Sequence, residues 1–219
     1  MKLQALLFAL LCFGIVLLLT SCASLPKETY LDAANLSGIK KVAVVVSVSA
    51  PEVTYASANA TGQGGLIGLV ATVVVLAEDN SHKREINGHV DLGSIGDKMA
   101  QSFLQPLKKS DRFQYAEYLT GKDQNRLHLA ADGYDAIIRL DVRDISIQKT
   151  VGYNATLCAK AHGQMECLAT GKVVWDREEF VASTEPRAIA YYEENGLKDL
   201  DTILEKAGRN LAYDFVYLK

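Results

Sequence analysis

Hydrophobic residues recur at two different spacings along this chain, and the spacing predicts which segments are strands and which are helices. A continuous β-branched run at 39–48 is typical of a strand buried on both faces. Apolar residues four positions apart predict a helix over 95–109, capped by Ser94 and bent by Pro106. An apolar stripe over 200–215 predicts a C-terminal helix packed on the core.

Shorter elements lie between these helices. The pattern indicates a strand at 112–118 and a helix at 122–132 that Gly133 ends. Residues 136–147 alternate as a strand does, but the apolar side changes from even to odd numbers near 143–144. A one-residue change of phase of this kind predicts a β-bulge.

The following strand is predicted to be unusually long. Residues 155–167 alternate without a break, and a turn at 169–172 leads into a return strand at 173–181. On one strand Cys158 and Cys167 face opposite sides, about 30 Å apart. We therefore expect no disulfide between them.

The order of these elements predicts the fold class. Strands and helices alternate at first, and a run of antiparallel strands precedes the last helix. We expect one α/β domain, with a mixed sheet, a long C-terminal antiparallel hairpin and covering helices. The chain shows no internal repeat.

The segment 64–77 (GGLIGLVATVVVLA) is apolar on every side. As a helix it spans about 21 Å, which is too short to cross a bilayer core of about 30 Å. Three interpretations stay open for it, namely core packing, an interface between subunits and contact with a membrane.

The first residues have the layout of a secretory signal, with Lys2 before an apolar stretch at 3–19. Leu19-Thr20-Ser21-Cys22 resembles the bacterial lipobox. That resemblance implies cleavage after Ser21, diacylglyceryl transfer to the Cys22 thiol and acylation of the new amine. An uncleaved transmembrane anchor is the alternative, although the stretch is at the lower length limit for a span.

These features divide the chain into three expected parts. Residues 1–21 are a lipoprotein signal peptide, 22–37 a lipidated tether, and 38–219 a periplasmic α/β domain that contains the apolar segment. The tether reaches at most about 50 Å when extended. By resemblance, Ala23 and Ser24 lack the aspartate that retains lipoproteins in the inner membrane, so we expect anchorage in the outer membrane.

Composition excludes several classes of protein. The chain has 49% hydrophobic residues, 22% charged residues and a net charge of −3. This balance is that of a globular domain. It excludes a disordered tail protein, a multi-span membrane protein and an electrostatically driven nucleic-acid binder.

No group of residues has the spacing of a catalytic, metal or cofactor site. The histidines fall on separate elements without a HxxxH pair, and His162 is expected to be solvated beside Lys160 and Gln164. No GxSxG is present. The other candidates are carboxylates expected to serve solubility, a glycine set that only approximates a dinucleotide fingerprint, and two glycosylation-type sequons expected to stay bare. The histidines are His82, His89, His128 and His162, and the carboxylates are Asp141, Asp144, Glu178 and Glu179. The glycines are Gly62, Gly64 and Gly68, and the two sequons begin at Asn59 and Asn154.

The predicted elements, with "GYDAIIRL" at 133–140 and "TGKVVW" at 170–175, resemble a known family over roughly residues 38–215. The chain is similar to envelope lipoproteins with a domain of the TolB N-terminal type, which include the curli-secretion pore subunit and activators of penicillin-binding proteins. The resemblance implies a protein that is not an enzyme and that binds partners or assembles. Unlike the pore subunit, the chain has no pair of amphipathic membrane hairpins.

Two functional hypotheses follow. The first is a non-catalytic lipoprotein, anchored through Cys22, whose periplasmic domain binds an envelope protein or forms a homo-oligomer. The alternative is a component of an envelope transport or secretion system, in which the segment 64–77 contacts the membrane.

Overall fold

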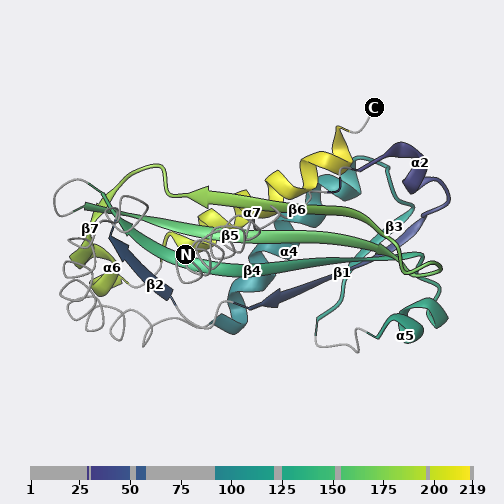
Figure 1. The fold of residues 1–219 in the computed structure, drawn as a ribbon, viewed down its shortest axis with the longest axis horizontal. Helices are drawn as coiled ribbons and strands as arrows, with labels where there is room; N and C mark the ends of the chain where they lie inside the picture. The colour runs from purple at the N-terminus through teal and green to yellow at the C-terminus, as the bar shows by residue number, and fades with distance from the viewer. Residues whose placement is uncertain are drawn as a thin grey trace, which may run out of the picture.

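One open, mixed sheet organises the part of the chain that the computed structural model describes. That part comprises residues 29, 31–49, 53–57, 92–120, 125–150, 154–195 and 198–217. Its main path runs β3-β1-β4-β5-β6, so that β3 and β6 form the two edges of this path. The long strands β4, β5 and β6 extend along the length of the molecule (Figure 1). The predicted fold class, a single α/β domain with a mixed sheet, is confirmed.

The sheet is parallel on one side and antiparallel on the other. β1 (Lys41–Val48) is parallel to both β3 (Tyr115–Tyr118) and β4 (Ala136–Lys149). β5 (Asn154–Cys167) is antiparallel to β4 and to β6 (Val173–Ala182), which makes the long hairpin that the alternation predicted. The first half of β1 is buried on both faces, because Val42 and Val44 belong to the main core and Ala43 and Val45 to a smaller cluster on the other face.

Two long helices cover one face of the sheet. α4 (Leu92–Lys109) and α7 (Leu200–Val216) lie side by side behind the strands (Figure 1). Their apolar faces bury an aromatic group in which the rings of Trp175 and Phe215 are 4.8 Å apart and those of Phe103 and Phe215 are 5.8 Å apart. Edge-to-face geometry of this kind adds to the burial of apolar area in holding the helices on the sheet.

The opposite face is covered only in part by the described residues. α5 (Arg126–Ala131) lies at one end and closes a smaller apolar cluster that contains Val45, Leu129 and Ile137. Further along this face, polar side chains from β4, β5 and β6 lie side by side. We refer to this side of the sheet as the open face.

The details of the hairpin agree with the sequence pattern. β5 is one continuous strand, and the register of β4 shifts between Val142 and Asp144, where the bulge was predicted. Gly171, with φ +70°, allows the turn into β6, and Gly133, with φ +77°, follows the end of α5. Cys158 and Cys167 are free and lie toward opposite ends of β5.

Other predicted boundaries were wrong. Ser94 lies inside α4, which begins at Leu92, so it is not the N-cap. The strand expected over 112–118 is limited to β3, and α5 begins only at Arg126, after the cap residue Asn125. Besides the short helix α2 (Ala33–Leu36), three elements were not predicted at all. They are β2 (Val53–Ser57), parallel to the second half of β4; β7 (Arg187–Ala188), paired with the start of β5; and α6 (Ile189–Asn195).

The end of the expected tether is docked on the domain. Thr29 makes an isolated antiparallel bridge to Asp176 of β6, with N···O distances of 3.1 and 3.0 Å. Leu31 and Leu36 are buried; Leu31 precedes the short helix α2 (Ala33–Leu36), and Leu36 is its last residue. Of the expected tether, Thr29, Leu31 and Leu36 therefore contact the domain.

Candidate interaction surface

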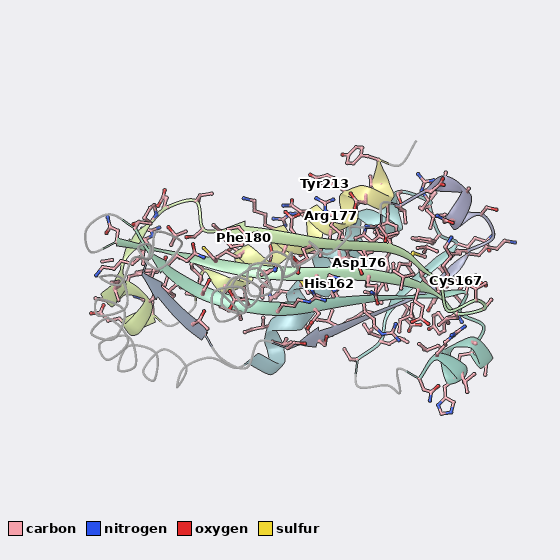
Figure 2. All side chains as sticks on the ribbon, in the orientation of Figure 1. His162, Cys167, Asp176, Arg177, Phe180 and Tyr213 are labelled. Carbon is pink, nitrogen blue, oxygen red and sulfur yellow. The ribbon has the colours of Figure 1, made fainter. Side chains whose placement is uncertain are left out.

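A polar network crosses the centre of the open face. His162 on β5 lies between β4 and β6, with its Nδ1 2.8 Å from the Arg143 guanidinium and its Nε2 2.9 Å from an Asp176 carboxylate oxygen. Gln164 donates to the other Asp176 oxygen at 2.9 Å. His162 is only 8% exposed, so the expectation that it is solvated was wrong. Figure 2 shows His162 on β5 and Asp176 on the adjacent strand β6.

The geometry fixes the state of the His162 ring. A guanidinium only donates hydrogen bonds, so Nδ1 accepts from Arg143 and Nε2–H donates to Asp176. Both ring nitrogens are thereby engaged, and neither is available as a general base to an incoming substrate. Burial raises the pKa of Asp176, but the Gln164 and His162 hydrogen bonds outweigh it and hold that pKa below its usual range. The network is therefore suited to holding strands together.

The four candidate carboxylates do not converge. Asp141 accepts hydrogen bonds from the hydroxyls of Ser47 and Ser49 at 2.9 and 2.7 Å, and Asp144 lies beyond the bulge near Thr54. Glu178 projects from the open face and Glu179 from the helical face of β6. Asp141 and Glu178 lie 3.7 and 2.9 Å from the same Arg143 guanidinium, so this pair shares a cation and not the contrasting environments that separate a general acid from a general base.

Glu178 and Glu179 are each neutralised by cations. Lys160 and Arg143 both lie 2.9 Å from Glu178. The Lys160 hydrogen bond, which outweighs the effect of burial, lowers the pKa of Glu178. On the other face Arg177 lies 3.1 Å from Glu179, and Asn210 of α7 donates to it at 2.6 Å.

α7 fastens β6 to the rest of the sheet. Asp214 accepts from the indole N–H of Trp175 at 2.8 Å and from Arg177. The Arg177–Asp214 ion pair and the neighbouring Trp175–Asp214 hydrogen bond together hold β6 in one position against α7. The edge that β6 presents is therefore rigidly supported.

Along this edge, a stretch of backbone has no partner strand in the described part of the chain. Both backbone groups of Asp176 point away from β5 and pair with Thr29. In an antiparallel pair, the backbone N–H and C=O groups of every second residue point away from the partner strand. Those of Glu178, Phe180 and Ala182 therefore point away from β5, as those of Asp176 do. The Ser183 N–H bonds to Leu157 of β5, as this alternation requires. We call residues 178–182 the open edge of β6.

A large aromatic side chain occupies the centre of the open edge. Phe180 is 58% exposed, and Tyr213 on α7 is 48% exposed. Figure 2 shows Phe180 and Arg177 on β6, with Tyr213 on the adjacent helix. An unpaired strand edge with an exposed aromatic residue is a template for pairing with another strand.

A shallow pocket lies beside the first turn of α7, with a volume of about 290 Å³. Its charged lining residues are Glu185, Arg187, Asp199 and Lys206. Arg187 and Glu185 pair with each other at 3.0 Å. Because acids and bases alternate around this pocket, it offers no single charge to a ligand.

The two described cysteines differ in environment. The Thr170 hydroxyl and the backbone N–H groups of Thr170 and Ala169 lower the pKa of the Cys167 thiol, although partial burial opposes them. Burial raises the pKa of the Cys158 thiol. Cys167 is accordingly the more nucleophilic thiol of the pair at neutral pH.

Several candidate residues lie outside the described residues. They are Cys22, His82, His89, Asn59, Gly62, Gly64, Gly68 and the segment 64–77. His128 lies on α5 and the exposed Asn154 at the start of β5, away from the His162 network. Within the described ranges no three His, Cys, Asp or Glu side chains are grouped as metal ligands, and none of the helices there has the length and apolarity of a membrane span.

No family model and no curated protein matches this chain. Among solved structures, it is similar to the PelC dodecamer from Paraburkholderia phytofirmans, at 9% identity and a TM-score of 0.47 over 88% of this chain and 96% of that one. It is also similar to the lipoprotein GNA1162 from Neisseria meningitidis, at 13% identity and a TM-score of 0.38 over 78% and 96%. A Xanthomonas campestris protein described under the family model DUF330 matches at 12% identity and a TM-score of 0.41 over 84% and 88%. The resemblance to the TolB N-terminal type in particular stays a prediction.

Proposed function

We propose that this chain is a lipoprotein of the bacterial outer membrane, anchored through Cys22, whose periplasmic domain is not an enzyme. Its function is to bind, either to another envelope protein or to copies of itself. The single observation that carries the binding role is the open edge of β6, which α7 supports rigidly and which exposes Phe180.

The non-catalytic part of the proposal is supported by the state of the polar groups. His162, which lies against the Asp176 carboxylate, has both ring nitrogens engaged. Glu178 and Glu179 are paired with cations on opposite faces of the strand. Groups arranged in this way stabilise the sheet and offer no free acid, base or nucleophile.

The docked N-terminal segment supports anchorage close to the membrane. Only six residues lie between Cys22 and Thr29, so a lipid on Cys22 holds Thr29 within at most about 25 Å of the bilayer surface. This length suits a domain that meets partners at the membrane.

Capture from intact envelopes tests the proposal. The tagged protein, with its native anchor, is crosslinked in cells and then extracted in mild detergent. We expect it to be recovered from the outer-membrane fraction in complexes larger than a monomer. Cys22→Ser is the matched control, which is expected to lose acyl-chain incorporation and membrane fractionation. Recovery of lipidated monomer alone would contradict the binding role, and a Cys22→Ser protein that still carried acyl chains would contradict the anchor.

A further inference from the structure

We propose that the open edge of β6 pairs antiparallel with the same edge of a second copy, about a twofold axis at Phe180. The two sheets then become one continuous sheet across the dimer. This inference rests on the proposed function and specifies its self-assembling form.

The free backbone groups define a segment that is symmetric about Phe180. On one side, Thr29 already occupies the outward groups of Asp176. On the other side, β6 ends at Ala182. The outward residues left between these limits are Glu178, Phe180 and Ala182, with Phe180 in the middle.

A twofold axis at Phe180 uses all of these groups. Phe180 pairs with its own copy, and Glu178 of each chain pairs with Ala182 of the other. Both partners in such a pair exchange N–H···O=C bonds, because all three residues point outward. Every outward N–H and C=O group of the open edge is therefore satisfied in the dimer.

Charge excludes the neighbouring registers on the N-terminal side of Phe180. An axis at Glu178 or at Glu179 would place identical carboxylates directly opposite each other, which is destabilising. With the axis at Phe180, Glu178 lies opposite Ala182 and Glu179 opposite Val181. No like charges then face each other across the axis.

The acidic residues of β6 do not make the edge as a whole repel a second copy, because each has a cationic or hydrogen-bonding partner within its own chain. Glu178 is held by Lys160 and Arg143, and Glu179 by Arg177. Their charges are therefore compensated before the edges meet.

Apolar contact completes the pairing. The Phe180 side chain is 58% exposed in the single chain, and in the dimer the two rings stand side by side on the open face. Aromatic cross-strand pairs of this kind stabilise a sheet. A second copy therefore satisfies the shape, the backbone groups and the charge pattern of this edge together.

Disulfide trapping in the outer membrane tests both the pairing and its register. The full-length lipidated protein carries Cys158→Ala and Cys167→Ser, so that Cys22 is the only native cysteine left after signal cleavage. Opposed residues in a hydrogen-bonded pair have Cα atoms about 5.5 Å apart, which a disulfide can bridge. We expect Phe180→Cys to crosslink to a covalent dimer under mild oxidation.

Matched positions make the experiment specific. Tyr213→Cys is similarly exposed but lies near Arg177, about 10 Å along the strand from the axis, and is expected to stay monomeric. Glu178→Cys and Ala182→Cys are each expected to crosslink poorly alone, and to form a mixed dimer when two differently tagged copies are expressed together. Equal crosslinking at Phe180 and Tyr213, or Glu178→Cys crosslinking alone as strongly as the mixed pair, would overturn the proposal.

A charge on the axis provides an independent measurement. Phe180→Lys places two ammonium groups opposite each other, so native mass spectrometry in detergent should find a dimer for the wild type and a monomer for the variant. Tyr213→Lys should remain dimeric, and thermal unfolding checks that both variants fold. A wild type that is monomeric overturns the pairing. If it still captures an envelope partner, the proposed function stands without this dimer.

Discussion

Gly208 lies where α7 crosses α4 most closely, and replacing it with alanine tests the contact between the two helices. A Cβ atom built on Gly208 would lie 3.1 Å from the Phe103 backbone nitrogen and less than 3.0 Å from the Met99 carbonyl oxygen. Both obstacles are backbone atoms, so no side chain can rotate out of the way. The two helices must move apart for the methyl group to fit.

Two effects of opposite sign decide the result. Alanine is favoured over glycine in a helix by about 1 kcal/mol. Overpacking a well-packed contact costs about 1–3 kcal/mol, and a collision with backbone belongs at the upper end of that range. We therefore expect a net loss of about 2 kcal/mol in the free energy of unfolding. For a domain of this size the midpoint of unfolding should fall by about 4–8 °C.

Thermal unfolding followed by circular dichroism measures this change. Arg209→Ala is the matched control, because Arg209 is exposed on the same turn and its pair with Glu205, at 3.5 Å, is exposed too. That substitution should change the free energy of unfolding by less than about 0.5 kcal/mol. If Gly208→Ala raised the midpoint, helix propensity would be the larger effect and the close approach of α4 and α7 would be refuted.

Three further predictions concern the open face and its borders. The pKa of Asp176 is lower in the folded protein than the unfolded value of 3.8, so its carboxylate stabilises the fold at a pH above 3.8. This stabilisation is lost as the pH falls through the folded pKa, so acid titration should destabilise the wild type more than Asp176→Asn. Cys167 should react with iodoacetamide at pH 7 faster than Cys158, and Thr170→Ala should slow it, as mass spectrometry of the labelled peptides would show. Ser146→Ala should raise the free energy of unfolding by about 1 kcal/mol in urea titrations, since its buried hydroxyl has no hydrogen-bond partner among the described residues; a loss of stability would argue against this.

The long hairpin could be predicted because its signals are local. The alternation of β5 depends only on neighbouring residues, and the bulge near Asp144 is visible as a change of phase in one strand. Gly133 and Gly171 mark turns because few other residues adopt a positive φ. These features needed no knowledge of distant contacts.

The elements that were missed depend on contacts between distant segments. β2 is short, and it becomes a strand by pairing with the half of β4 that follows the bulge. The burial of His162 requires Arg143 and Asp176 to reach it from two adjacent strands, and therefore requires their register. The open edge could not be predicted either, because alternation shows where a strand is but not whether a neighbour lies beside it.

The docking of Thr29 on Asp176 has a mechanical consequence. With the proposed lipid anchor on Cys22, a force between the membrane and the domain would enter the fold at this bridge, which consists of two backbone hydrogen bonds. After this bridge breaks, the packing of Leu31 and Leu36 would be the next to separate, before the force reaches the main strands of the sheet. Once detached and extended, residues 29–40 would lengthen the tether by up to about 40 Å. Under tension the segment would thus detach and extend while the core of the sheet stays folded.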